Sequence, residues 1–73
     1  QAAGEHQQAA EAYHGLLQTR ASEPGWWIGL ALSLEALNKP EQAKTAYQNV
    51  FKIPQLSPVL ADFVSQRLAQ LGG

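Results

Sequence analysis

His6 and His14 are the residues of this sequence best suited to hold a metal ion or to move a proton. They are eight residues apart, whereas two ligands on one face of a helix need a spacing of three or four. The chain has no cysteine, which excludes a thiolate metal site and a disulfide framework. We therefore expect no metal and no cofactor, and we interpret both histidines as facing solvent.

Acid–base and nucleophilic chemistry have equally weak support. Glu11 and His14 have the spacing of a hydrogen-bonded pair on a helix, but general acid–base catalysis also needs a pocket, which the sequence does not suggest. No serine lies in a G-x-S-x-G turn. Gly25 and Gly29 lack the lysine or the third glycine of a phosphate-binding loop. The sequence predicts a protein that is not an enzyme.

Composition narrows the class of partner. With 73 residues, 45% of them hydrophobic, the chain is one small domain or a piece of a larger array, with enough apolar material for a core. The five Lys and Arg are scattered and the net charge is -1, so we expect no binding to nucleic acid and no direct membrane contact. No apolar run approaches the roughly 20 residues of a membrane span. The chain begins at Gln1 and lacks Met, which we interpret as a segment of a longer protein.

The sequence repeats itself after 34 residues. Repeats with periods of 20 to 50 residues are typical of stacked helical arrays. Six of the eight identical pairs fall on small, apolar and proline positions where a repeat is most constrained: Ala9 with Ala43, Ala12 with Ala46, Tyr13 with Tyr47, Pro24 with Pro58, Leu34 with Leu68, and Leu37 with Leu71. The period predicts that equivalent helices recur along the chain.

Helical periodicity and helix-boundary residues predict four helices. We expect the first over residues 5–20, the second from Pro24 to a left-handed Asn38, and the third from Pro40 to a break at 52–55. The fourth is expected from an N-cap at Ser57 to Gly72-Gly73. The predicted apolar stripes are Ala9, Ala12, Tyr13, Leu16 and Leu17; Trp27, Leu30, Ala31, Leu34 and Leu37; and Ala43, Ala46, Tyr47, Val50 and Phe51.

Six residues resemble the tetratricopeptide repeat pattern W-x₂-L-G-x₂-Y…A-x₃-F…P: Trp27, Leu30, Ala31, Leu34, Ala43 and Tyr47. The resemblance implies an all-α fold, a right-handed solenoid segment of antiparallel helices that binds other protein chains. It implies one full repeat over 24–57, the second helix of a partial repeat over 5–23, and a capping helix over 58–71. Residues 1–4 would then be the tail of a separate helix.

A narrower resemblance lies in the string Pro24-Gly25-Trp26-Trp27-Ile28-Gly29-Leu30-Ala31-Leu32 and in Leu56-Ser57-Pro58. Both are similar to the C-terminal repeat region of bacterial type IV pilus biogenesis proteins, the mannose-sensitive haemagglutinin pilus system in particular. This resemblance implies a parent protein in the bacterial cell envelope. It also implies a role as a scaffold in assembly of a pilus or secretion apparatus.

The repeat resemblance also implies where a partner binds. The inner, concave face would carry Gly25, Ile28, Leu32 and Glu35 in one repeat and Val59, Asp62, Gln66 and Ala69 in the next. The expected binding residues are Ile28, Leu32, Glu35, Asp62, Gln66 and Trp26. Because Ile28 and Leu32 are apolar, we expect the partner to be a protein or peptide with an apolar segment.

Several alternatives remain open at this stage. A neighbouring repeat or the final helix could cover Ile28 and Leu32, and Trp26 could either cover a neighbouring helix or stay partly exposed. The chain could also serve as a self-association module that forms a homo-oligomer. A third alternative is a regulatory or positioning arm of a larger enzyme.

Overall fold

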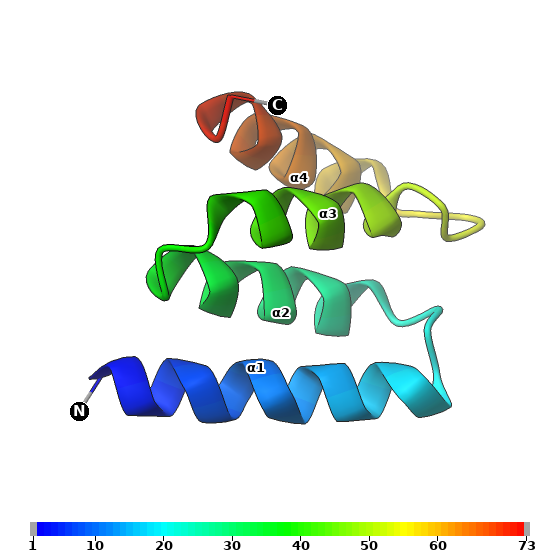
Figure 1. The fold of residues 1–73 in the computed structure, drawn as a ribbon. Coiled ribbons are helices and arrows are strands. Elements are labelled where there is room, and N and C mark those ends of the chain that lie inside the picture. The colour runs from blue at the N-terminus through cyan, green and yellow to red at the C-terminus, as the bar shows by residue number, and fades with distance from the viewer. Residues whose placement is uncertain (1, 73) are drawn as a thin grey trace.

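The computed structural model describes residues 2–72 and shows an all-α fold. Four helices follow one another: α1 (Ala2–Thr19), α2 (Pro24–Ala36), α3 (Pro40–Val50) and α4 (Pro58–Gln70). Successive helices run in opposite directions and lie side by side, with α2 between α1 and α3 (Figure 1). The described residues contain no strand. The predicted fold class, antiparallel helices joined by short turns, is confirmed.

Prolines begin three of the helices, as the sequence predicts. Pro24, Pro40 and Pro58 each lie in the first turn, where a residue without an N–H loses no helical hydrogen bond. Ser57 does occupy the N-cap position before Pro58, but its side chain makes no capping hydrogen bond. Ser57 is therefore the N-cap by its extended backbone and by its carbonyl, which accepts from the N–H of Ala61 at 2.9 Å, and not by its hydroxyl.

Left-handed residues end two of the helices. Asn38 follows α2 with φ of 61°, and the next backbone N–H, that of Lys39, donates to the carbonyl of Leu34 at 2.9 Å. This pattern satisfies carbonyls that the end of the helix leaves free. Gly72 follows α4 with φ of 81°, the conformation that glycine adopts without strain. Gly73 lies outside the described residues.

Helix α1 differs from the prediction in extent and in its buried stripe. It begins at Ala2, so residues 2–4 continue α1 and the predicted tail of a separate helix is wrong for them; Gln1 lies outside the described residues. The buried residues are Ala10 and Leu17, whereas Leu16 is 41% exposed. The physical reason is that α1 makes extensive contacts with α2 alone, so it turns one stripe toward that helix.

The core lies around α2 and α3. Both predicted stripes of these helices are largely buried, except that Phe51 is 44% exposed. Val64 is the fully buried residue that α4 contributes. The buried hydrophobic residues are Ala10, Leu17, Ile28, Leu30, Ala31, Leu34, Ala43, Ala46, Tyr47, Val50 and Val64.

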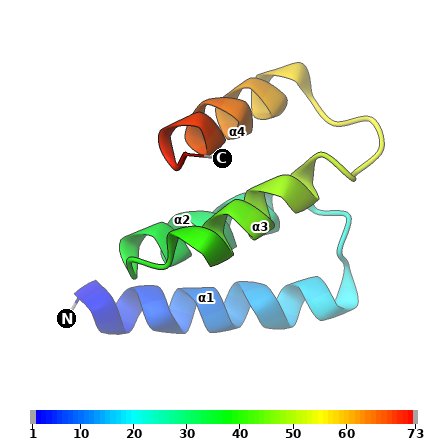
Figure 2. The same cartoon turned by 45° about the horizontal axis from the view of Figure 1, so that its top comes forward.

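Helices α1 and α2 approach closely at one glycine. A Cβ atom placed on Gly29 would lie 2.4 Å from Cζ of the Tyr13 ring, so any other residue here would force the ring or the helices to shift. Thirty-four residues later the equivalent positions are Phe63 and Tyr47. Phe63 is 39% exposed, and the contact between α4 and α3 is the least extensive of the three between successive helices. Figure 2 shows α4 set apart from the other three helices.

Candidate functional site

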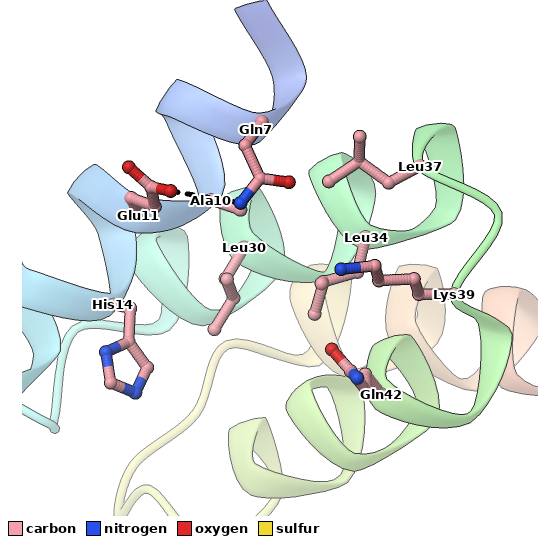
Figure 3. A pocket seen from close by; sticks show the side chains of 9 residues that line it. All are labelled: Gln7, Ala10, Glu11, His14, Leu30, Leu34, Leu37, Lys39 and Gln42. Carbon is pink, nitrogen blue, oxygen red and sulfur yellow. Dashed lines mark hydrogen bonds between the residues drawn. The ribbon is translucent and has the colours of Figure 1, made fainter. Parts of the chain in front are cut away.

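A groove lies where α1 and α3 both pack against α2. Its volume is about 300 Å³. Side chains from all three helices and from the turn before α3 surround it, as Figure 3 shows. The lining residues are Gln7, Ala10, Glu11, His14, Leu30, Leu34, Leu37, Lys39 and Gln42. A site of this kind requires three helices together, so no single segment of the sequence contains it.

The apolar part of the groove comes mainly from α2 and the residue after it. Leu30, Leu34 and Leu37 are four and three residues apart, so they share one face of the helix. Leu30 and Leu34 are each 8% exposed, while Leu37 is half-buried. Ala10 contributes the apolar part of the α1 side, where its small side chain leaves room above the leucines. The surface that remains accessible is mostly carbon.

The rim of the groove is polar. The α1 side carries Gln7, Glu11 and His14, and the Gln7 side-chain amide donates to the Glu11 carboxylate at 3.0 Å. The opposite side carries Lys39 and Gln42. One side therefore presents a carboxylate and the other an ammonium group. The two glutamine amides can both donate and accept hydrogen bonds, which suits the main chain of a bound peptide.

The expected binding face on the other side of α2 is only partly available. Leu32 is 42% exposed, but Ile28 is 9% exposed and belongs to the core. The expectation that Ile28 and Leu32 present a joint apolar surface is therefore wrong, because the chain's own core covers Ile28. Asp62 and Gln66 are exposed on α4. Trp26 is half-buried and packs against the core cluster, so both interpretations of it hold in part.

The remaining expected residue, Glu35, is engaged by two other helices. The guanidinium group of Arg67 on α4 donates to both carboxylate oxygens of Glu35, with Nε 3.3 Å from Oε2. The hydroxyl of Tyr47 on α3 donates to the same Oε2. The Glu35 side chain is only 14% exposed. Glu35 is therefore part of a polar contact between α2, α3 and α4, and does not form the open edge of a groove.

The charges of this contact shift its pKa values. Burial favours the neutral form of Glu35, but the hydrogen bonds from Arg67 and Tyr47 outweigh it and hold the carboxyl pKa below the usual 4.5. Burial and the hydrogen bond to Glu35 raise the pKa of Tyr47 to about 12. The hydrogen bond to Glu35 also raises the pKa of Arg67. The three groups bond to one another across α2, α3 and α4, which indicates a structural role.

Trp27, the most prominent residue of the repeat pattern, is also structural. Its ring packs against the core, and its Nε1–H donates to the carbonyl of Ala21 at 2.7 Å. This bond fixes α2 to the turn that precedes it. Residues 2–72 contain no group of three potential metal ligands among His, Asp and Glu. None of the helices in that range is long and apolar enough to cross a membrane.

The sequence analysis missed the groove and Arg67. The prediction that Leu30 and Leu34 belong to the core is confirmed, but nothing in a linear pattern shows that a groove opens above them beside the half-buried Leu37. A signal for Arg67 did exist, because it carries the opposite charge to Glu35 and follows it by nearly one repeat period. In a stacked array such residues lie on equivalent helices of successive repeats, here α2 and α4.

Comparisons of the chain with protein-family models, with curated proteins and with solved structures return no match. The resemblance to tetratricopeptide repeats and to pilus biogenesis proteins therefore stays a prediction, and the all-α fold is the part of it that the structure shows.

Proposed function

We propose that the chain is a non-catalytic protein-binding module that takes an apolar segment of another polypeptide into the groove between α1 and α3. The observation that carries the proposal is the groove itself, whose floor of Leu30, Leu34 and the half-buried Leu37 lies beneath a polar rim. Apolar area removed from water contributes about 25 cal/mol per Å², so an apolar side chain that covers the accessible part of this floor, mostly Leu37, favours binding. The rim then orients the bound segment.

The size and charge of the groove define the partner. A volume of about 300 Å³ is at the small end of ligand sites and suits one or two large side chains of a peptide. Glu11 and Lys39 lie on opposite sides of it. The best partner segment therefore carries a large apolar residue between a basic residue, for Glu11, and an acidic residue, for Lys39.

A selection experiment tests this proposal. Short random peptides displayed on phage are selected on the folded chain, and the enriched peptides are titrated into a sample with labelled leucine methyl groups. We expect the enriched peptides to share a large apolar residue and to shift the methyl signals of Leu30, Leu34 and Leu37. The exposed Leu32 is the internal control. Shifts confined to Leu32, or no enriched sequence at all, would exclude the groove as the binding site.

Self-association is the second candidate function, and the exposed apolar side chains favour it. Leu32, Phe51, Val59 and Phe63 are between 39% and 75% exposed. Sedimentation velocity over a wide range of protein concentrations separates the two candidates. A peptide-binding module sediments as a monomer throughout, whereas a self-association module shows a mass that increases with concentration. The narrower role as a scaffold in a bacterial pilus or secretion apparatus rests on the resemblance of residues 24–32 and 56–58 alone.

A further inference from the structure

A second pocket lies farther along α1 and α3 than the groove of Figure 3. Its volume is about 290 Å³. The turn after α1 and the end of α3 with the segment that follows it supply the lining residues: Ala21, Ser22, Asn49, Lys52, Ile53 and Pro54. Helices α1 and α3 run in the same direction (Figures 1 and 2). The groove takes its residues from earlier positions on both helices, so the two cavities follow one another along the same line.

Helix geometry places the groove and the second pocket on one face of the molecule. Gln42 of the groove and Asn49 of the second pocket are seven residues apart on α3, close to two full turns, so they share a face of that helix. On α2, the half-buried Trp27 precedes the groove residue Leu30 by three positions and shares its face. The Nε1–H of Trp27 donates to the carbonyl of Ala21, which lines the second pocket. Trp27 therefore lies between the two cavities.

The distance between the cavities limits what can occupy both of them. Seven helical residues, the spacing of Gln42 and Asn49, span about 10 Å. An extended polypeptide rises about 3.3 Å per residue, and its successive side chains point to opposite sides. Two side chains that both point toward α2 are therefore an even number of residues apart. A spacing of four residues, about 13 Å, is the shortest even spacing that bridges this distance.

Polar side chains at both cavities favour an extended segment over a helix. Gln7 and Gln42 lie at the groove, and Ser22 and Asn49 lie at the second pocket. Amide and hydroxyl groups both donate and accept hydrogen bonds. The main chain of an extended segment has N–H and C=O groups that need such partners, whereas a helix pairs most of its own.

We infer that the partner segment is extended and fills both cavities, with two large apolar side chains four residues apart. The inference rests on the proposed binding of a peptide in the groove and adds a second anchor to it. Lys39 at the groove and Lys52 at the second pocket are both exposed and carry the same charge. The segment therefore carries an acidic residue next to each apolar anchor.

A series of synthetic peptides tests the spacing. Each fluorescein-labelled peptide has a background of glycine and serine, two phenylalanines two to seven residues apart, and an aspartate beside each phenylalanine. A peptide with one phenylalanine and the same charge is the control. Fluorescence anisotropy in a titration with the full chain gives each dissociation constant. We expect the spacing of four to bind about tenfold or more tighter than the control, through the apolar area that the second anchor buries.

A lysine variant tests the second pocket. Lys52→Gln should weaken binding of the spacing-four peptide by about two- to fivefold, as expected for an exposed ion pair, and should leave the one-phenylalanine control unchanged. Lys44→Gln is the matched control, because Lys44 lies on α3 outside both cavities and pairs with Glu41. Equal effects of the two variants on the spacing-four peptide would contradict the inference.

Methyl signals separate failure of this inference from failure of the proposed function. With labelled leucine and isoleucine methyl groups, Leu37 reports on the groove and Ile53 on the second pocket. The spacing-four peptide should shift both signals. If it shifts only Leu37 and gains no affinity, the inference is overturned and peptide binding in the groove stands. Tightest binding at a spacing of seven would also overturn it, because a helix covers the same distance in seven residues. If no peptide shifts Leu37, both proposals fail.

Discussion

Arg67 on α4 and Glu35 on α2 form a two-pronged ion pair across 32 residues of sequence. Tyr47 on α3 donates to the same carboxylate, so three helices meet at one side chain. Because α4 has the least extensive helix contact in the fold, this pair contributes more to its position than a surface ion pair would. The contact also explains why Glu35 is not free to receive a partner.

Arg67→Ala should lower the free energy of unfolding more than the loss of an exposed ion pair does, since it leaves the Glu35 carboxylate, whose side chain is only 14% exposed, without its cation. Urea denaturation measures the change. Arg20→Ala is the matched control, because the Arg20–Glu23 pair is long, at 3.5 Å, and much more exposed. Such pairs contribute about 0–1 kcal/mol. Equal losses in the two variants would contradict the role assigned to Arg67.

Acid should weaken the contribution of Glu35 to stability. The carboxyl pKa is lower in the folded chain than the usual 4.5, so below that pH the unfolded chain binds more protons. The contribution is therefore fully present above pH 4.5 and is lost as the pH falls through the folded pKa. The difference in free energy of unfolding between the wild type and Glu35→Gln should shrink from pH 7 to pH 3. A difference that is constant over this range would exclude the linkage.

Alkali should weaken the fold through Tyr47. Its pKa is raised from 10.0 to about 12 in the folded chain, so between these values the folded chain holds a proton that the unfolded chain has lost. Stability should fall as the pH rises from 10 to 12. The Tyr47→Phe variant lacks this titration, and its denaturation curves over the same pH range supply the baseline. Parallel losses in the two proteins would show that other groups cause the effect.

Gly29→Ala should destabilise the chain, because its Cβ would lie 2.4 Å from the Tyr13 ring and either the ring or the two helices would have to move apart. Overpacking of this kind costs roughly 1–3 kcal/mol. Gly25→Ala is the control on the same helix, since nothing lies within 4 Å of its Cβ position. Thermal denaturation should show a lower midpoint for Gly29→Ala only. The double variant with Tyr13→Leu should recover part of the loss.

Local signals predicted the helices well. Pro24, Pro40 and Pro58 mark helix starts through a property of the residue itself, the missing N–H, and Asn38 marks an end through its tolerance of positive φ. The predicted stripe of α1 was less accurate. Its alanines and leucines allow more than one apolar face, and the choice between them depends on which neighbouring helices are present.

The candidate site was less predictable because it depends on distances between helices. The repeat resemblance placed Ile28 and Leu32 together on an open face, but burial separates them, at 9% and 42% exposed. The groove lies instead over Leu34, which is a core residue as predicted, and over Leu37, which is only half-buried. When a helix carries more apolar side chains than its neighbouring helices can cover, the sequence alone does not show which of them remain accessible to solvent.

The most direct test of the proposed function compares two leucine variants of the folded chain, Leu37→Gln and Leu32→Gln. Isothermal titration calorimetry measures the dissociation constant of a peptide selected on the wild type for each variant. Leu37 lines the groove, whereas Leu32 is exposed outside it. If the groove is the binding site, Leu37→Gln weakens binding by about tenfold and Leu32→Gln leaves it unchanged. If Leu32→Gln weakens peptide binding and Leu37→Gln does not, the groove is not the binding site, and the peptide binds at the face that carries Leu32.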